Sequence, residues 1–255
     1  MTIKMPKVVL LGVPDSGIHI LNELVSGMPP LRPGGWINQW EEDVYARLKT
    51  IRDGEVWAGY LDYSREMKQW LDDHRIRRIF IYRDPRDVLL DQLSFILNED
   101  NKHLYYPYFT RHMKSLDERL MKMITGFYDT RANARRYGLQ HIGYSNINHV
   151  FIPYLRWLQD PNLCTIPYEN LVNAPSGYLA EMHRIADYLW KDTRLSERSK
   201  TEYLQRLQDA PVSQALQHAT TGEWKRYFTD EIKRVFKQTA GELLIYLGYE
   251  SDDHW

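Results

Sequence analysis

The stretch GVPDSGIH, residues 12–19, holds the side chains whose types and spacing most suggest chemistry. An apolar run precedes it and apolar residues at helical spacing follow it, so the N–H groups from Ser16 and Gly17 onward open a helix N-terminus. Such a terminus favours an anion such as phosphate, because the helix dipole is positive there. The loop nevertheless carries a carboxylate, Asp15, at its centre and a histidine, His19, just after it. A plain strand–turn–helix corner is the alternative for the loop, and packing or helix capping is the alternative for His19.

A second strand end carries a cation. Arg83 closes the apolar run 77–83 and precedes Asp84 and Pro85, which are typical of a helix N-cap and first helical position. A guanidinium beside a helix start can bind phosphate in a bidentate manner. The alternative is an ion pair with a local carboxylate such as Asp84 or Asp87. Because ligands of open α/β sheets bind beyond the carboxyl ends of the strands, we expect both strand ends to contribute to one site.

The segments that must position these side chains alternate between strands and helices. We expect strands at 7–13, 55–61, 77–83 and within 163–171, and helices at 18–25, 65–74, 84–97, 117–127, 146–159, 175–208 and 231–249. We expect loops at 26–35 and 98–112. This order predicts an α/β fold with a central parallel sheet flanked by helices. No linker composition interrupts it, so we expect a single domain over residues 1–255.

The composition of the chain excludes several classes of protein. The chain has 255 residues, 43% of them hydrophobic and 26% charged, which argues against disorder. A net charge of −1 argues against a general nucleic-acid binder. The single cysteine, Cys164, excludes an internal disulfide, is expected in the core, and indicates a reducing compartment. Because we find no signal peptide, membrane-length apolar stretch or metal-site spacing, we expect a cytoplasmic protein that acts on a small molecule, without a metal.

Four segments, in this order, resemble the PAPS-dependent sulfotransferase family over nearly the whole chain. GVPDSGIHIL resembles its phosphosulfate loop, RRIFIYRDPRDVLL its 3′-phosphate segment, LCTIPYENLV its strand with Tyr-Glu-Asp-Leu, and TGEWKRYFTDE its C-terminal segment. The resemblance implies the sulfotransferase fold, which is similar to that of P-loop NTPases, and a site for PAPS or PAP. On the matching positions, it implies donor contacts from Ser16, Gly17, Arg83, Tyr168 and Trp224.

The resemblance also implies where an acceptor would bind. The aromatic segment HLYYPYFTRH, residues 103–112, resembles the variable acceptor loop of the family. It implies substrate contacts from His103, Tyr105, Tyr106 and His112. The alternative is a loop that its own tyrosines pack down.

Several positions that bind the donor in the family differ here in charge. The family's loop lysine falls at Asp15, its catalytic histidine at Tyr60, and the serine that helps to hold the 3′-phosphate at Asp91. Its Arg-Lys-Gly triplet falls at residues 217–219, which are Gln-His-Ala. Lys to Asp changes the local charge by two units, each worth about 3 kcal/mol at roughly 5 Å and an effective dielectric of about 20. The change disfavours a bound phosphate by up to ~6 kcal/mol before screening, so we expect a remodelled donor site.

The hypothesis that we favour is an enzyme repurposed on this scaffold. Asp15 and Tyr60 would act as an acid–base or substrate-orienting pair on a small molecule, with His19 as a third catalytic candidate. Such an enzyme would not use PAPS for ordinary sulfuryl transfer, so we expect no cofactor. For Tyr60 the alternative is a half-buried aromatic residue without a chemical role.

Two other hypotheses remain open. A genuine PAPS-dependent sulfotransferase would need other cations to reach the phosphates, for example Lys4, Lys7 or Arg86. A catalytically silent binding protein would keep the fold for a ligand alone. The sequence does not predict an oligomeric state.

Overall fold

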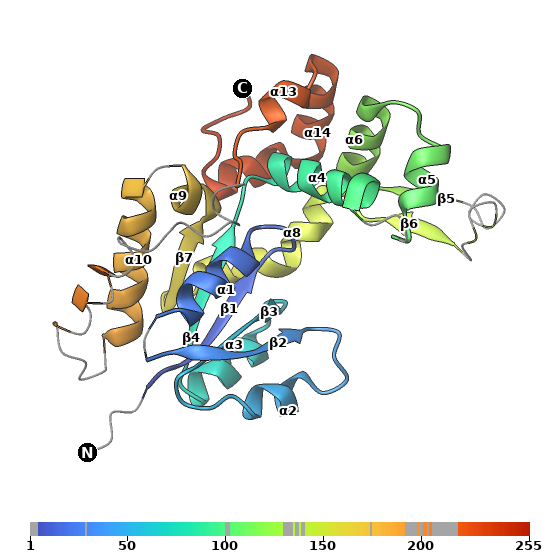
Figure 1. Cartoon of the computed structure of the whole chain (residues 1–255). Helices are drawn as coiled ribbons and strands as arrows, with labels where there is room; N and C mark the ends of the chain where they lie inside the picture. Colours follow the sequence, from blue (N-terminus) through green and yellow to red (C-terminus); the bar gives the residue numbers. More distant parts are fainter. Residues whose placement is uncertain are drawn as a thin grey trace. The chain divides into compact units, whose positions relative to one another are not determined.

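The computed structural model describes residues 5–28, 30–99, 103–129, 135, 138, 141–173, 175–191, 198, 201–202, 204–205 and 219–255. The chain divides into two compact units, each built from two stretches (Figure 1). Unit 1 comprises Met1–Arg83 and Pro153–Thr221, and unit 2 comprises Asp84–Ile152 and Gly222–Trp255. That residues 1–255 form one domain remains a prediction.

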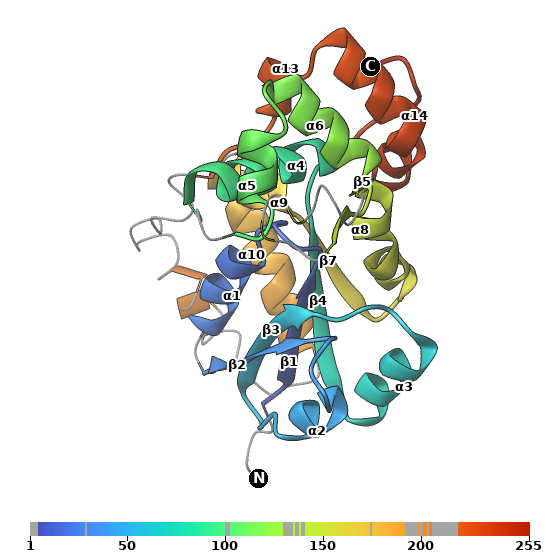
Figure 2. The ribbon, with the colours of Figure 1, turned by 90° about the vertical axis from the view of Figure 1, so that its right-hand side faces the viewer.

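Unit 1 is organised around a five-stranded sheet in the order β2-β3-β1-β4-β7 (Figures 1 and 2). Its strands are β1 (Lys7–Gly12), β2 (Arg32–Asn38), β3 (Glu55–Tyr60), β4 (Ile76–Tyr82) and β7 (Leu163–Pro167). Neighbouring strands are parallel throughout, as predicted. The segments that follow β1, β3 and β4 therefore leave the sheet at the same edge, the carboxyl edge.

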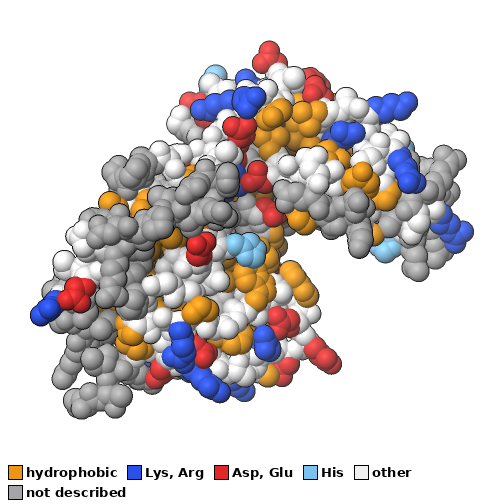
Figure 3. Space-filling model, in the orientation of Figure 1, with side chains coloured by type: hydrophobic (Ala, Val, Ile, Leu, Met, Phe, Trp, Pro, Cys, Tyr) orange, Lys and Arg blue, Asp and Glu red, His pale blue; other side chains and the backbone are white. Residues whose placement is uncertain are grey.

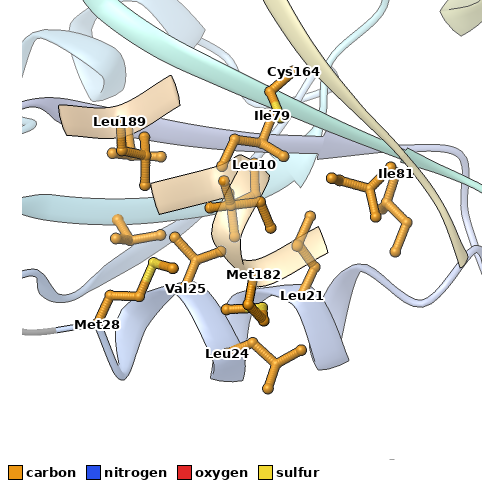
Figure 4. Packing of buried hydrophobic residues seen from close by; sticks show 14 of the residues in the cluster. Leu10, Leu21, Leu24, Val25, Met28, Ile79, Ile81, Cys164, Met182 and Leu189 are labelled. Atoms are coloured by element: carbon orange, nitrogen blue, oxygen red, sulfur yellow. The ribbon is translucent and has the colours of Figure 1, made fainter. Parts of the chain in front are cut away.

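Helices cover the sheet of unit 1. They are α1 (Ile18–Ser26), α2 (Val44–Lys49), α3 (Arg65–Asp73), α9 (Tyr168–Val172) and α10 (Pro175–Trp190). Figure 4 shows how α1 and α10 pack on one face, where every second strand residue points into a common core. The labelled core residues are Leu10, Leu21, Leu24, Val25, Met28, Ile79, Ile81, Cys164, Met182 and Leu189.

Unit 2 is mostly helical. Its elements are α4 (Pro85–Ser94), a π-helical turn (Phe95–Glu99), α5 (Tyr106–Arg111), α6 (Leu116–Thr125), the antiparallel pair β5 (Phe127–Asp129) and β6 (Ile142–Tyr144), α13 (Trp224–Tyr227) and α14 (Asp230–Leu247). Helix α8 (Ile147–Leu155) and the 3₁₀ turn Arg156–Gln159 carry the chain from unit 2 back into unit 1.

A buried arginine ties unit 2 together. Arg86, which is 2% exposed, donates to both carboxylate oxygens of Asp84 and to Glu250. Its guanidinium lies over the rings of Trp224 and Trp255, at 3.7 and 4.5 Å from their centroids. One cation therefore joins the start of α4 to α13 and to the segment that follows α14.

Two segments differ from the prediction of loops at 26–35 and 98–112. Strand β2 begins inside the predicted loop 26–35. Its Gly34 and Gly35 lie against the ring of Trp57, and a Cβ on Gly34 would be 2.3 Å from that ring, so only glycine fits there. The register shift between Pro33 and Trp36 is the bulge that such glycines permit. Helix α5 begins inside the second, with a proline in its first turn.

Cys164 lies in the core, as predicted, and burial raises the pKa of its thiol to about 11. None of the described helices is long and apolar enough to cross a membrane. Figure 3 shows positive and negative side chains interspersed over the described surface in view, in keeping with the near-zero net charge.

Candidate functional site

The loop after β1 presents main-chain N–H groups at the start of α1. The Ser16 N–H donates to the Val13 carbonyl at 3.1 Å, which closes a turn. Asp15 adopts the left-handed conformation, with φ 62°, which aspartate tolerates better than most residues. Gly17, with φ 88°, is the N-cap of α1 and has no side chain to cap the helix. The uncapped N-terminus fits the predicted anion cradle.

The loop hides its hydroxyl and exposes its carboxylate. Ser16 is fully buried, and its Oγ has no hydrogen-bond partner among the described residues. Asp15 is exposed. Water therefore screens its charge, and the change from Lys to Asp costs a bound phosphate about 2 kcal/mol at ~4 Å, well below the value estimated from sequence.

Two predicted donor contacts, Gly17 and Arg83, lie against a third, Tyr168. A Cβ on Gly17 would lie 2.3 Å from Cδ2 of this tyrosine, and the guanidinium of Arg83 lies 4.3 Å from its ring centroid. Arg83 is 3% exposed, and its Nη2 donates to the Thr220 carbonyl at 3.0 Å. Gly17 is also the neighbour of Ser16 in the loop. The cation at the strand end is thus engaged by an aromatic ring and a main-chain oxygen.

Tyr60, the last residue of β3, lies beside Asp15. The main-chain N–H of Asp15 donates to the Tyr60 hydroxyl, while burial, and then the Asp15 charge, raises the pKa of Tyr60 to about 12. A tyrosine with this pKa is protonated at neutral pH. It can donate a hydrogen bond or a proton, but it is a poor general base.

An aromatic stack extends the site beyond these residues. The ring of His19 stacks on Trp36 with centroids 4.8 Å apart and planes 10° apart, and Trp36 meets Tyr60 edge-on at 5.4 Å. His19 is exposed, so packing against Trp36 orients its ring. Trp36 was not predicted as a site residue, because the two glycines before it are typical of a loop.

A second pair of polar residues adjoins Tyr60. The Tyr154 hydroxyl donates to Asp62, and the pKa of Tyr154 is raised by burial and then by the nearby charge of Asp62. Burial also raises the pKa of Asp62. Asp62 was not predicted as a site residue. The available signal was its position two residues after Tyr60, just beyond the end of the predicted strand 55–61. Tyr154 gave no such signal.

Two further predicted donor contacts belong to unit 2. Trp224 is 8% exposed, lies under Arg86, and its main-chain N–H donates to Asp87 at 3.0 Å. Asp91 is exposed on α4. In unit 2, Trp224 thus packs in the interior around Arg86 while Asp91 faces solvent.

The predicted substrate contacts also belong to unit 2: His103, Tyr105, Tyr106 and His112. The Tyr105 hydroxyl donates to the Gly143 carbonyl at 2.8 Å, and its ring meets Tyr144 at 5.3 Å. His112 stacks on Tyr108 at 4.8 Å. Packing of this kind is what the alternative, a segment held by its own aromatic residues, requires.

A genuine sulfotransferase would need Lys4, Lys7 or Arg86 to reach the phosphates of PAPS, and the structure describes two of these cations. Lys7 opens β1, so at ~3.3 Å per residue it lies about 17 Å from the loop at the other end of the strand. Arg86 is bound within unit 2. Lys4 and residues 217–218 lie outside the described residues. Within the described part of the chain, no three His, Cys, Asp or Glu side chains form a group that could hold a metal.

Comparison with known proteins gives a family and a fold. A family model described as a sulfotransferase domain matches residues 5–248. The mouse sulfotransferase SULT7A1 complexed with PAP is similar in structure, with a TM-score of 0.62 and 14% identity over 95% of this chain and 87% of that chain.

Two structures of retinol dehydratase are similar as well, each with 14% identity. The complex with retinol and PAP has a TM-score of 0.54 and covers 94% of this chain and 82% of that chain. The complex with androsterone and inactive cofactor PAP has a TM-score of 0.55 and covers 93% and 80%. At this identity the likeness concerns the fold alone. No curated protein matches the chain.

Proposed function

Because this chain belongs to the sulfotransferase family, we propose that it is an enzyme of that family with a remodelled donor pocket. It acts on a small-molecule substrate without ordinary sulfuryl transfer from PAPS. The observation that carries the proposal is the pairing of Asp15 with Tyr60, at the positions that resemble the family's loop lysine and catalytic histidine.

The two side chains suit complementary roles. Asp15 offers an exposed carboxylate that can accept a proton or orient a hydroxyl or cationic group of the substrate. Tyr60 stays protonated and can donate to an oxygen on which negative charge develops. His19, held against Trp36, gives the substrate an aromatic surface beside the pair.

The state of Arg83 also supports remodelling. The guanidinium of Arg83 is buried, lies over Tyr168 and uses an N–H group on the Thr220 carbonyl, so fewer of its donors are left for a phosphate. With the Asp15 carboxylate in the loop, the residues present are a poor fit to PAPS.

A genuine PAPS-dependent sulfotransferase is the second candidate, and one observation favours it. The buried Oγ of Ser16 has no partner among the described residues, and Gly17 leaves the start of α1 uncapped. An anion such as the phosphate of PAP would satisfy both.

Titration with PAP by calorimetry separates the two candidates. We expect the folded protein to bind PAP only weakly, with a dissociation constant in the millimolar range. Asp15→Asn removes one negative charge and keeps a residue that tolerates the left-handed loop conformation, so we expect it to improve PAP affinity about fivefold.

The matched control is Asp73→Asn, which removes the same charge from an exposed position at the end of α3 and should leave PAP affinity unchanged. Micromolar binding of PAP to the unmodified protein would overturn the proposal in favour of the second candidate. Mass spectrometry after incubation with small hydroxyl compounds checks the chemistry. A sulfated product that forms only with PAPS would also contradict the proposal.

A further inference from the structure

A pocket of about 560 Å³ lies at the amino edge of the sheet, the edge opposite to the loop. It lies wholly within unit 1. Residues at the starts of β1 and β4 line it, together with residues that follow α3 and residues of α10; among them are Lys7, Arg75, Arg77, Arg78 and Tyr188. Ligands of such sheets bind at the carboxyl edge, so the activity proposed above leaves this pocket unexplained.

A buried guanidinium at this pocket has unused donors. Arg78 is 2% exposed, and its Nη2 lies 2.7 Å from Asp72 and 2.9 Å from Asp160. Its Nε and Nη1 are buried and have no hydrogen-bond partner among the residues that the structure describes. Buried N–H groups almost always have an acceptor, so these two indicate a ligand with acceptor oxygens.

Further positive charge surrounds the same pocket. Lys7 and Arg75 line it, and neither forms an ion pair within the described ranges. Arg75 is held in the left-handed conformation, with φ 55°, after His74, the C-cap residue of α3. Arg77 lies over the ring of Tyr188, at 5.3 Å from its centroid. The cations therefore converge from three elements of the fold.

The carboxylates at the pocket do not cancel this charge. Asp72 already pairs with Lys68 at 2.6 Å and with Arg78. Asp53 is the other acidic residue of the lining, and it is exposed. His74, also in the lining, stacks on Trp70. The lining as a whole carries more positive than negative charge.

Part of the lining is apolar and fixed in place. The Tyr188 hydroxyl donates to the Asn162 carbonyl at 2.8 Å and accepts from the Arg78 N–H at 3.1 Å. Because its hydroxyl is already hydrogen-bonded, Tyr188 can contact a ligand through its ring, and Ile76 and Leu189 add aliphatic surface to the lining. A pocket of this size and lining suits an organic ligand better than a bare inorganic ion.

We propose that this pocket binds a small organic oxyanion, a phosphate or sulfate monoester. Its anionic group binds Arg78, Lys7 and Arg75, and its apolar group packs on Tyr188. Guanidinium and ammonium groups are the usual partners of such oxyanions.

The test is calorimetric titration of the full-length protein with phenyl phosphate, phenyl sulfate and inorganic phosphate. We expect at least one ester to bind at least tenfold more tightly than inorganic phosphate. Because Arg78 is buried and pairs with the buried carboxylate of Asp160, its removal can unfold the protein, so the variant is the double change Lys7→Ala and Arg75→Ala. It should weaken ester binding at least tenfold. Arg65→Ala, at an exposed cation that begins α3, is the matched control and should change nothing.

Each other outcome overturns the proposal. No ester binding at millimolar concentration by the folded protein would exclude the site. Equal affinity for inorganic phosphate would exclude the ester. If Asp15→Asn improved the affinity for the ester and the double variant left that affinity unchanged, the ester would bind at the loop after β1 instead. The titration with PAP reports on the loop separately, so the failure of one proposal does not imply the failure of the other.

Discussion

Arg86→Met lowers the free energy of unfolding by about 3–5 kcal/mol, which is the expected cost of removing one partner from a buried ion network. The change leaves the carboxylates of Asp84 and Glu250 without their cation, and Asp84 is only 5% exposed. It also removes the guanidinium that lies over the rings of both Trp224 and Trp255. Denaturant titration of the full-length protein measures the loss.

The matched control is Arg234→Met on α14. Arg234 pairs with Glu231 at 2.6 Å, but both side chains are more than half exposed, so its loss costs at most about 1 kcal/mol. Adding Asp84→Asn to Arg86→Met keeps an N-cap side chain while removing the stranded charge, and should recover part of the loss. Equal costs for Arg86→Met and Arg234→Met would show that the network does not stabilise unit 2.

Gly17→Ala is expected to cost about 3 kcal/mol, from overpacking together with a left-handed alanine. The new Cβ would lie 2.3 and 2.6 Å from two ring atoms of Tyr168, and φ at this position is 88°. Tyr168 cannot move aside easily, because it is 4% exposed and Arg83 lies over its ring. Thermal unfolding should show a fall of roughly 6–12 °C.

Gly248→Ala isolates the backbone part of this cost. Gly248 ends α14 with φ 80°, and a Cβ there would meet nothing within 4 Å. Its replacement should therefore cost only about 1 kcal/mol. If the two alanine variants lost the same stability, the close approach of the loop to Tyr168 would make no energetic contribution.

The parts of the fold that sequence predicted are those with strong local signals. Buried apolar runs marked β1, β3 and β4, and they are confirmed. The start of α4 is also confirmed, since the Asp84 side chain accepts from the Arg86 N–H at 2.9 Å, and α14 ends before a left-handed Gly248. Strand β2 was missed because Pro33 and the glycines after it have the composition of a turn, and only packing on Trp57 explains them.

The candidate site was predictable only in part. The rule that ligands bind at the carboxyl edge grouped Asp15 with the strand ends. Side-chain contacts between distant segments leave no such trace, as with Trp36 against His19. One partner of Arg83 is the carbonyl of Thr220. Every residue carries a main-chain carbonyl, so no sequence motif indicates this contact.

The interleaved order of the two units has a consequence for synthesis on the ribosome. Strands β1, β3 and β4 can pair once Tyr82 has been translated, but β7, the outer neighbour of β4, begins only at Leu163. Through the translation of unit 2's first stretch, β4 presents an unpaired edge to other nascent chains. Pairings so distant in sequence form slowly. We therefore expect this protein to depend on chaperones during translation more than a chain whose units follow one another in sequence.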